Sequence, residues 1–138
     1  MTVKQSVFWD DLARDLEDPE FLREYVVEFV RIATIDTIVN DLDDAREAAG
    51  LSKAELARAI QVEPATIRRL FASEKSNPTI GTLAEVAAVL GLRITVELLT
   101  KDERAQITEP LLDGRTADPT GLARHLDELR GRRSRASA

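Results

Sequence analysis

The sequence predicts an all-α fold, a helical bundle with an N-terminal helical extension and one short C-terminal strand. Apolar residues recur every three or four positions between Phe21 and Ala45, which is the period of an α-helix. Three shorter stretches with the same period follow between residues 53 and 90, and only a few residues separate them. Residues 93–98 alternate between polar and apolar side chains, a pattern typical of a half-buried strand.

The long N-terminal helix is predicted to begin at Asp18-Pro19-Glu20. Asp18 suits the N-cap position, and Pro19 suits the first helical position because its missing amide hydrogen has no partner there. Gly50 is predicted to end the helix in a left-handed conformation. Since residues 34–37 are rich in β-branched side chains and the run is long for one globular helix, we expect a break or a bend there.

The three short helices are predicted at residues 53–60, 64–71 and 80–90. Ser52 and Thr79 are the expected N-caps of the first and third, and Gly91 is expected to end the third. These signals place successive short helices close together in the middle of the chain.

The predicted strand at residues 93–98 has no evident partner in its own chain. A lone strand leaves backbone amides and carbonyls unpaired. We therefore expect it to pair either with the same segment of a second subunit or with a short strand around residues 107–112. The first alternative predicts a homodimer whose dimerisation residues are Ile94, Val96 and Leu98.

The end of the chain is predicted to contain a loop, a short helix and a basic tail. The loop covers residues 113–119, and Thr120 is the expected cap of a helix that carries Leu122, Leu126 and Leu129. The tail GRRSRASA is expected to be disordered. The predicted organisation is thus a helical extension (1–45), a central domain (46–91), a dimerisation strand (92–100) and a C-terminal segment (101–138).

Composition excludes several classes of function. The chain of 138 residues has no cysteine and one histidine, His125, so we expect no metal site, no cofactor and no catalytic triad. We find no phosphate-binding glycine loop and no nucleophile beside a base, and expect the protein not to be an enzyme. No leader or membrane-spanning run is recognisable, so a cytoplasmic location without membrane contact is expected.

Charge is unevenly distributed along the chain. The formal net charge is −6, but residues 1–50 hold 13 acidic against 5 basic residues, whereas residues 51–100 hold 5 against 6. Such an asymmetry suggests separate roles for the two segments. An acidic total therefore does not exclude nucleic-acid binding by the middle of the chain.

The central stretch GLSKAELARAIQVEPATIRRLF, followed by SNPTIGTLAEVAAVLGL, resembles the Cro-like helix-turn-helix of the xenobiotic-response-element (Xre) repressor family. The resemblance implies a sequence-specific DNA-binding transcriptional repressor that binds a double-stranded operator as a dimer. It implies that Ile67 and Leu70 anchor the second helix from inside, so that its other face can enter a major groove.

The resemblance also implies which residues contact DNA. Arg69 is the first choice for reading a guanine edge, with Arg68 beside it, because a guanidinium group matches the two guanine acceptors. The methyl groups of Ala65 and Thr66 suit contacts with thymine. Residues in positions that commonly touch phosphates complete the predicted site: Ser52, Lys53, Lys75 and Asn77.

Three positions depart from the family pattern. Gln61 occupies a turn position where glycine is frequent, and a left-handed backbone there would cost roughly 1 to 2 kcal/mol. Pro64 gives up a polar base contact at the start of the second helix. Phe71 replaces a frequent glutamate, which leaves Arg46 without its usual partner and available for phosphate.

The segment LEDPEFLREY, a long amphipathic helix and then the motif resemble antitoxins of the host-inhibition-of-growth type. The resemblance implies a basic toxin as a partner, attracted by the acidic N-terminal surface. Phe21, Tyr25 and Phe29 are the candidate toxin-binding residues, and they fit a hydrophobic core or dimer contact equally well. Two alternatives remain: a free-standing Xre-type regulator, and a protein-interaction scaffold with a degenerate helix-turn-helix.

Overall fold

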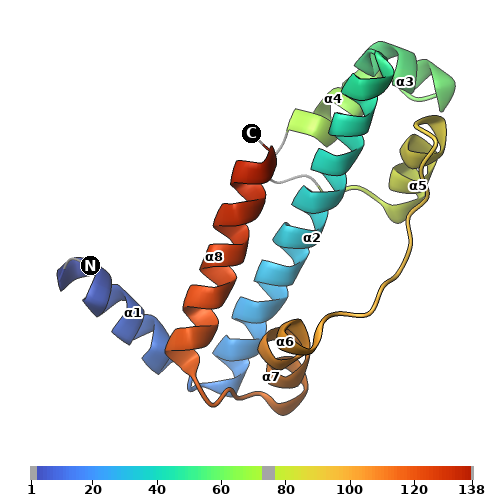
Figure 1. Ribbon diagram of the computed structural model, residues 1–138. Coiled ribbons are helices and arrows are strands. Elements are labelled where there is room, and N and C mark those ends of the chain that lie inside the picture. The colour runs from blue at the N-terminus through green and yellow to red at the C-terminus, as the bar shows by residue number, and fades with distance from the viewer. Residues whose placement is uncertain (1–2, 73–76, 138) are drawn as a thin grey trace. The chain divides into compact units, whose positions relative to one another are not determined.

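The computed structural model describes residues 3–72 and 77–137, with side chains for residues 7–72 and 77–128 (Figure 1). The described chain is predominantly helical, and none of these residues lies in a β-strand. The helices are α1 (Val3–Asp15), α2 (Pro19–Ala49), α3 (Lys53–Ala59), α4 (Pro64–Ala72), α5 (Ile80–Val89), α6 (Lys101–Glu103), the π-helical turn η1 (Arg104–Thr108), α7 (Glu109–Asp113) and α8 (Pro119–Ser137).

Helix α2 runs without interruption for 31 residues, and Figure 1 shows it as one continuous helix. The predicted break at residues 34–37 is therefore wrong. The chain nevertheless changes its packing partners there, since contacts divide the molecule into one unit of residues 1–33 and 98–138 and another of residues 34–97. We call these unit 1 and unit 2. The β-branched residues of α2 lie where the helix passes from unit 1 to unit 2. The helix itself continues through these residues.

The division into units differs from the predicted domains. Residues 34–45, which we assigned to the extension, belong to unit 2, and residues 98–137 fold with the N-terminal helices. Helix α1 lies within the predicted helical extension (1–45), but the sequence did not identify it as a separate element. Three of its apolar residues, Val7, Phe8 and Trp9, are consecutive, which obscures the helical period.

Unit 1 has its own hydrophobic core, formed by α1, the first half of α2 and α8. The buried residues are Leu16, Leu22, Val26, Phe29, Ala33, Leu122, Ala123 and Leu126. Arg23 of α2 adds a polar link, since its Nε and one Nη donate to the carbonyl oxygens of Leu111 and Leu112 at 3.0 and 3.1 Å. These two bonds satisfy carbonyls at the end of α7 that have no partner within the helix.

Unit 2 has a second core, formed by the C-terminal half of α2 and helices α3, α4 and α5. The buried residues are Val39, Leu42, Leu56, Ala57, Ile67, Leu70, Leu83, Val86 and Ala87. The side chains come from four helices that are close together in the sequence, and each helix contributes two or three of them.

The predicted N-caps are confirmed at three helices. Asp18 accepts a hydrogen bond from the Glu20 amide at 3.0 Å at the start of α2. Thr79 accepts from the Thr82 amide at the start of α5. Ser52 forms a capping box with Glu55, in which each side chain accepts from the other residue's backbone amide at 3.0 Å.

Three helices of unit 2 end in the same hydrogen-bond motif. At Gly50 and Gly91 the backbone is left-handed, with φ of 71° and 76°, and the next amide donates to the carbonyl five residues earlier. Helix α3 ends in the same way at Gln61, whose φ is 60°. The Val62 amide donates to the Ala57 carbonyl at 2.9 Å. The backbone at Gln61 is therefore left-handed, although glutamine, unlike glycine, has a Cβ atom that makes this conformation unfavourable.

The predicted strand is not supported. Residues 93–100 form neither helix nor strand, and residues 107–112, the alternative partner, lie in η1 and α7. Alternating polar and apolar side chains are compatible with a strand, but a strand forms only where a neighbouring backbone supplies hydrogen bonds.

The C-terminal helix also differs from its prediction. Helix α8 begins at Pro119 with Asp118 as its cap, which accepts from the Gly121 amide at 3.0 Å, rather than behind Thr120. It continues to Ser137 through the tail that we expected to be disordered. Arginine has a high helix propensity, which explains why a basic sequence extends the helix.

Candidate nucleic-acid interface

Helices α3 and α4 form a pair joined by the turn at residues 60–63. The inner faces of the two helices carry Leu56 and Ala57 from α3 and Ile67 and Leu70 from α4, all buried in the core of unit 2. Ala57 has the smallest side chain of the four, which lets the two helix backbones approach closely. The burial of Ile67 and Leu70 fixes the rotation of α4 about its own axis.

This rotation turns Arg68 and Arg69 outward. Both residues are exposed, and among the residues that the structure describes neither has an ion pair or a hydrogen bond. The two guanidinium groups therefore have their donors available for an external acceptor. A guanidinium group presents donors in a planar fork that fits phosphate oxygens and the guanine edge.

The first turn of α4 carries the smaller candidate residues. Pro64 begins the helix, and Ala65 and Thr66 are half-buried. The Thr66 amide donates to the Glu63 carbonyl at 2.9 Å, so this amide already has a partner in the turn. The apolar surface that remains at this end of α4 suits contact with a methyl group better than hydrogen bonding.

The predicted phosphate-binding residues lie at the beginnings of two helices. Ser52 is exposed, and its hydroxyl oxygen accepts from the Glu55 amide, while the hydroxyl hydrogen can still be donated to another acceptor. Lys53 is half-buried at the first position of α3, and Asn77 is exposed ahead of the α5 cap. Lys75 lies outside the described residues.

Arg46 is engaged inside unit 2, contrary to our expectation that it would be available for phosphate. Its Nε lies 2.8 Å from a carboxylate oxygen of Asp43, and one Nη donates to the Leu51 carbonyl oxygen at 2.8 Å. The side chain is only 15% exposed. Asp43, one turn earlier on α2, replaces the partner that is missing at Phe71, and sequence reasoning did not consider a partner on the same helix.

The helix pair is locally basic although the whole chain is acidic. Residues 51–72 contain four basic and two acidic residues. One of the two acids, Glu55, is held in the capping box, where the Ser52 amide lowers the pKa of its carboxyl group by donating a hydrogen bond to it. A net positive surface on α3 and α4 favours an anionic partner.

The candidate dimerisation residues differ in exposure. Ile94 is half-buried and packs against the core of unit 2, whereas Val96 is 100% exposed and Leu98 is 91% exposed. Large apolar side chains at this exposure gain nothing from the fold of one chain. The structure therefore leaves the predicted contact surface uncovered on the chain itself.

The candidate toxin-binding residues belong mainly to the core of unit 1. Phe29 is buried, and Phe21 and Tyr25 are half-buried, with their rings stacked at a centroid distance of 6.3 Å. A buried ring is not available to a partner. Phe29 therefore belongs to the core, whereas Phe21 and Tyr25 keep part of their surface exposed beside the exposed acidic residues.

Two further properties follow from the described residues alone. Among them, no group of three or more histidine, cysteine or carboxylate side chains is arranged so that it could hold a metal ion. None of the described helices combines the length and the apolar character needed to cross a membrane.

Comparison with protein families gives a match over the same part of the chain. Residues 42–96 match the helix-turn-helix family, a segment that includes the end of α2, helices α3 to α5 and the residues that follow. The comparisons with curated proteins and with solved structures found no match. Residues 42–96 therefore form a helix-turn-helix domain of the Xre type, and such a domain points to DNA binding.

Proposed function

We propose that the protein is a sequence-specific DNA-binding transcriptional repressor in which α4 is the recognition helix. The observation that carries the proposal is the division of α4 into a buried face with Ile67 and Leu70 and an exposed face with Arg68 and Arg69. In helix-turn-helix proteins the second helix lies in the major groove and contacts base edges. The protein acts by occupying an operator, has no catalytic activity of its own and works in the cytoplasm.

The residues of the domain have separate roles in this proposal. Arg69 reads a guanine edge, and Arg68 contacts a second base or a phosphate beside it. Thr66 and Ala65 contact thymine methyl groups through apolar surface. Ser52, Lys53 and Asn77 bind phosphates and set the orientation of the domain, which gives affinity without sequence information.

An equilibrium titration with Arg69→Ala tests this proposal. The variant should lose about 1 to 3 kcal/mol of operator affinity, because a guanidinium contact to a base edge is removed. Binding of the unaltered protein to random duplex DNA should weaken steeply with salt, since phosphate contacts release counterions.

Arg14→Ala is the matched control, because Arg14 is an exposed arginine of α1 whose ion pair among the described residues is with Asp11 on the same helix. It changes the net charge equally and should leave operator affinity nearly unaltered. Equal losses in the two variants, or salt-independent binding, would contradict the proposal and favour a protein-interaction scaffold.

We further propose that unit 1 neutralises a basic toxin, which makes the protein the antitoxin of a toxin-antitoxin pair. The supporting observation is an acidic surface on α1 and the start of α2, where all the acidic residues between positions 10 and 28 are exposed: Asp10, Asp11, Asp15, Glu17, Asp18, Glu20, Glu24 and Glu28. Charge complementarity accelerates association with a basic partner. Phe21 and Tyr25 contribute at most their exposed edges.

Binding to the protein encoded by the adjacent gene tests the antitoxin role, if that gene encodes a small basic protein. The triple variant Glu17→Lys, Glu20→Lys, Glu24→Lys should slow complex formation, and more so at low salt. The control Asp102→Lys, Glu109→Lys, Asp113→Lys reverses three exposed acids of α6 and α7 and should bind normally. A solitary gene, or equal effects of both triples, would leave a free-standing regulator as the function.

A further inference from the structure

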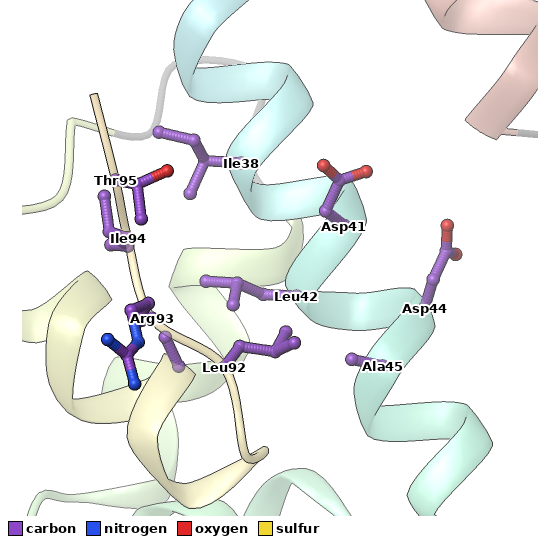
Figure 2. A pocket seen from close by; sticks show the side chains of 10 residues that line it. Ile38, Asp41, Leu42, Asp44, Ala45, Leu92, Arg93, Ile94 and Thr95 are labelled. Carbon is purple, nitrogen blue, oxygen red and sulfur yellow. The ribbon is translucent and has the colours of Figure 1, made fainter. Parts of the chain in front are cut away.

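Unit 2 contains an open pocket between α2 and the residues that follow α5 (Figure 2). It is lined by residues of α2, by Ala87 of α5 and by residues 92–95. Its volume of about 530 Å³ lies within the range that small-molecule sites usually have. None of the lining residues is among those proposed to contact DNA, so the proposed function does not account for this pocket.

The part of the pocket nearest the core is apolar. Leu42 of α2 and Ala87 of α5 belong to the core of unit 2 and are only 3% and 1% exposed. Figure 2 shows Ile38 and Leu42 extending from α2 toward the facing segment, where Leu92 and Ile94 lie. Such a surface favours the hydrocarbon part of a ligand, because moving apolar area out of water is favourable.

Two carboxylates line the α2 side of the pocket. Asp41 and Asp44 are exposed, and among the described residues neither side chain forms an ion pair or a hydrogen bond. Residues three positions apart on a helix are neighbours, with Cβ atoms about 5 to 6 Å apart. The two negative charges therefore lie close together without a counter-charge, which favours a cation beside both of them.

The one basic residue of the lining does not supply that cation. Arg93 follows α5, and Figure 2 shows its guanidinium group directed away from Asp41 and Asp44. No ion pair joins Arg93 to a carboxylate within the part of the chain that the structure describes. The pocket thus combines an apolar inner part with an acidic side that has no partner in its own chain.

We propose that this pocket binds a small organic cation, a protonated amine on an apolar body. The apolar body contacts Leu42, Ala87 and Leu92. The ammonium group lies between Asp41 and Asp44 and donates hydrogen bonds to their carboxylate oxygens. An inorganic cation would leave the apolar part empty, and a neutral or anionic molecule would leave the two carboxylates without a counter-charge.

This binding activity goes beyond the proposed repression and does not depend on it. The pocket lies apart from the exposed face of α4, and all tests below use the full chain without DNA. A protein that binds the amine but no operator would leave this inference intact. A protein that binds its operator but no amine would leave the proposed repression intact.

The first test compares three ligands with the same phenylbutyl body, namely 4-phenylbutylamine, 4-phenylbutan-1-ol and 4-phenylbutanoate. Calorimetric titration should show saturable binding of the amine at one site. The alcohol should bind about fivefold more weakly, because it has no charge for the carboxylates, and the anion should bind most weakly. Equal affinities for the amine and the alcohol, or no saturable binding of the amine, would overturn the proposal.

The second test removes the two carboxylates. The double variant Asp41→Asn, Asp44→Asn should bind the amine no better than the alcohol, while its affinity for the alcohol stays unchanged. The control Asp102→Asn, Asp113→Asn removes the same charge from exposed positions of α6 and α7 and should keep the preference for the amine. An equal loss in both double variants would show general attraction of a cation to an acidic protein, against a defined site.

The third test fills the pocket. Ala45 is half-buried in the lining, so Ala45→Phe should abolish binding of both the amine and the alcohol. Ala48→Phe makes the same change at an exposed position of α2 outside the lining and should bind normally. Circular dichroism checks that both variants are folded. Amine binding retained in folded Ala45→Phe contradicts the site, and amine binding that weakens as protein concentration rises identifies a second copy as the occupant instead.

Discussion

Unit 1 and unit 2 achieve a buried core by different routes. Unit 2 is one contiguous stretch of about 64 residues, in which short helices follow each other through tight turns. Unit 1 joins the N-terminal helices to residues 98–137. Its core therefore requires contacts between two segments that are separated in the sequence by all of unit 2. Local contacts form at a lower cost in chain entropy than distant ones. The comparison suggests that unit 2 organises first and that unit 1 depends on it.

The largest effect is expected from removing one buried leucine side chain in each unit. Leu56 and Leu122 are both fully buried, in unit 2 and unit 1 respectively. Each leucine-to-alanine change should lower the free energy of unfolding by about 2 to 5 kcal/mol. Leu56→Ala should also reduce operator binding, whereas Leu122→Ala should spare it as long as unit 2 remains folded. Urea denaturation and DNA titration measure the two effects.

Leu112→Ala is the control for this comparison. Leu112 is 74% exposed, so its truncation should change the free energy of unfolding by no more than about 0.5 kcal/mol. Loss of unit 2 structure in Leu122→Ala, seen as loss of DNA binding under native conditions, would show that the dependence between the units runs the other way.

A smaller effect is expected at the helix caps of the two units. Ser52 takes part in a reciprocal capping box, whereas Asp118 accepts a single backbone hydrogen bond from Gly121. Ser52→Ala should cost about 1 to 2 kcal/mol of unfolding free energy, and Asp118→Ala should cost less within the usual range for caps. Thermal unfolding of both variants checks the order, and a larger loss at Asp118 would contradict it.

The left-handed end of α3 offers a stabilising change. Gln61 adopts φ of 60° in the same motif in which Gly50 and Gly91 end their helices. Gln61→Gly should raise the free energy of unfolding by about 1 kcal/mol, because it relieves the steric strain at Cβ but gives the unfolded chain more freedom. Gln61→Ala retains the Cβ atom and should give no such gain. Equal behaviour of the two variants would exclude backbone strain as the cause.

The smallest effect concerns pH and belongs to unit 2. Hydrogen bonds from Ser52 lower the pKa of Glu55 in the folded state below its ordinary value of 4.5. The resulting stabilisation is therefore present above the unfolded pKa and is lost as pH falls through the folded pKa. Glu55→Gln should flatten the decline of stability in this acid range. If urea titrations at a series of pH values showed the same decline of the unfolding free energy at low pH in Glu55→Gln as in the unaltered protein, the prediction would be wrong.

The two units also differ in how far the sequence predicts them. In unit 2 the caps Ser52 and Thr79, the ends at Gly50 and Gly91 and the burial of Ile67 follow from local chemistry, since each signal acts within a few residues. The outward position of Arg69 follows from that burial. The sequence analysis did not identify Asp43 as the partner of Arg46. It considered a partner in another helix, at position 71, whereas Asp43 lies one turn earlier on the same helix.

Unit 1 was predicted less well because its core depends on contacts between distant parts of the sequence. Its helix α8 packs against residues a hundred positions earlier, and no local signal identifies that partner. The mistaken break in α2 and the unrecognised bounds of α1 both lie where distant packing decides the structure. The predicted strand shows the opposite error, since the local alternation at residues 93–98 suggested a strand, whereas these residues form neither helix nor strand in the structure.

Because α2 contributes side chains to both hydrophobic cores, the amides in its middle are protected by two clusters at once. We expect these hydrogen bonds to exchange with solvent more slowly than those at the ends of the helix, because they open only when the packing around them opens as well. A chain cleaved between residues 33 and 34 would lose the continuity of the helix, and each fragment would expose a frayed helix end where an interior turn had been. Helix α2 is therefore one continuous element that supplies side chains to two separate cores.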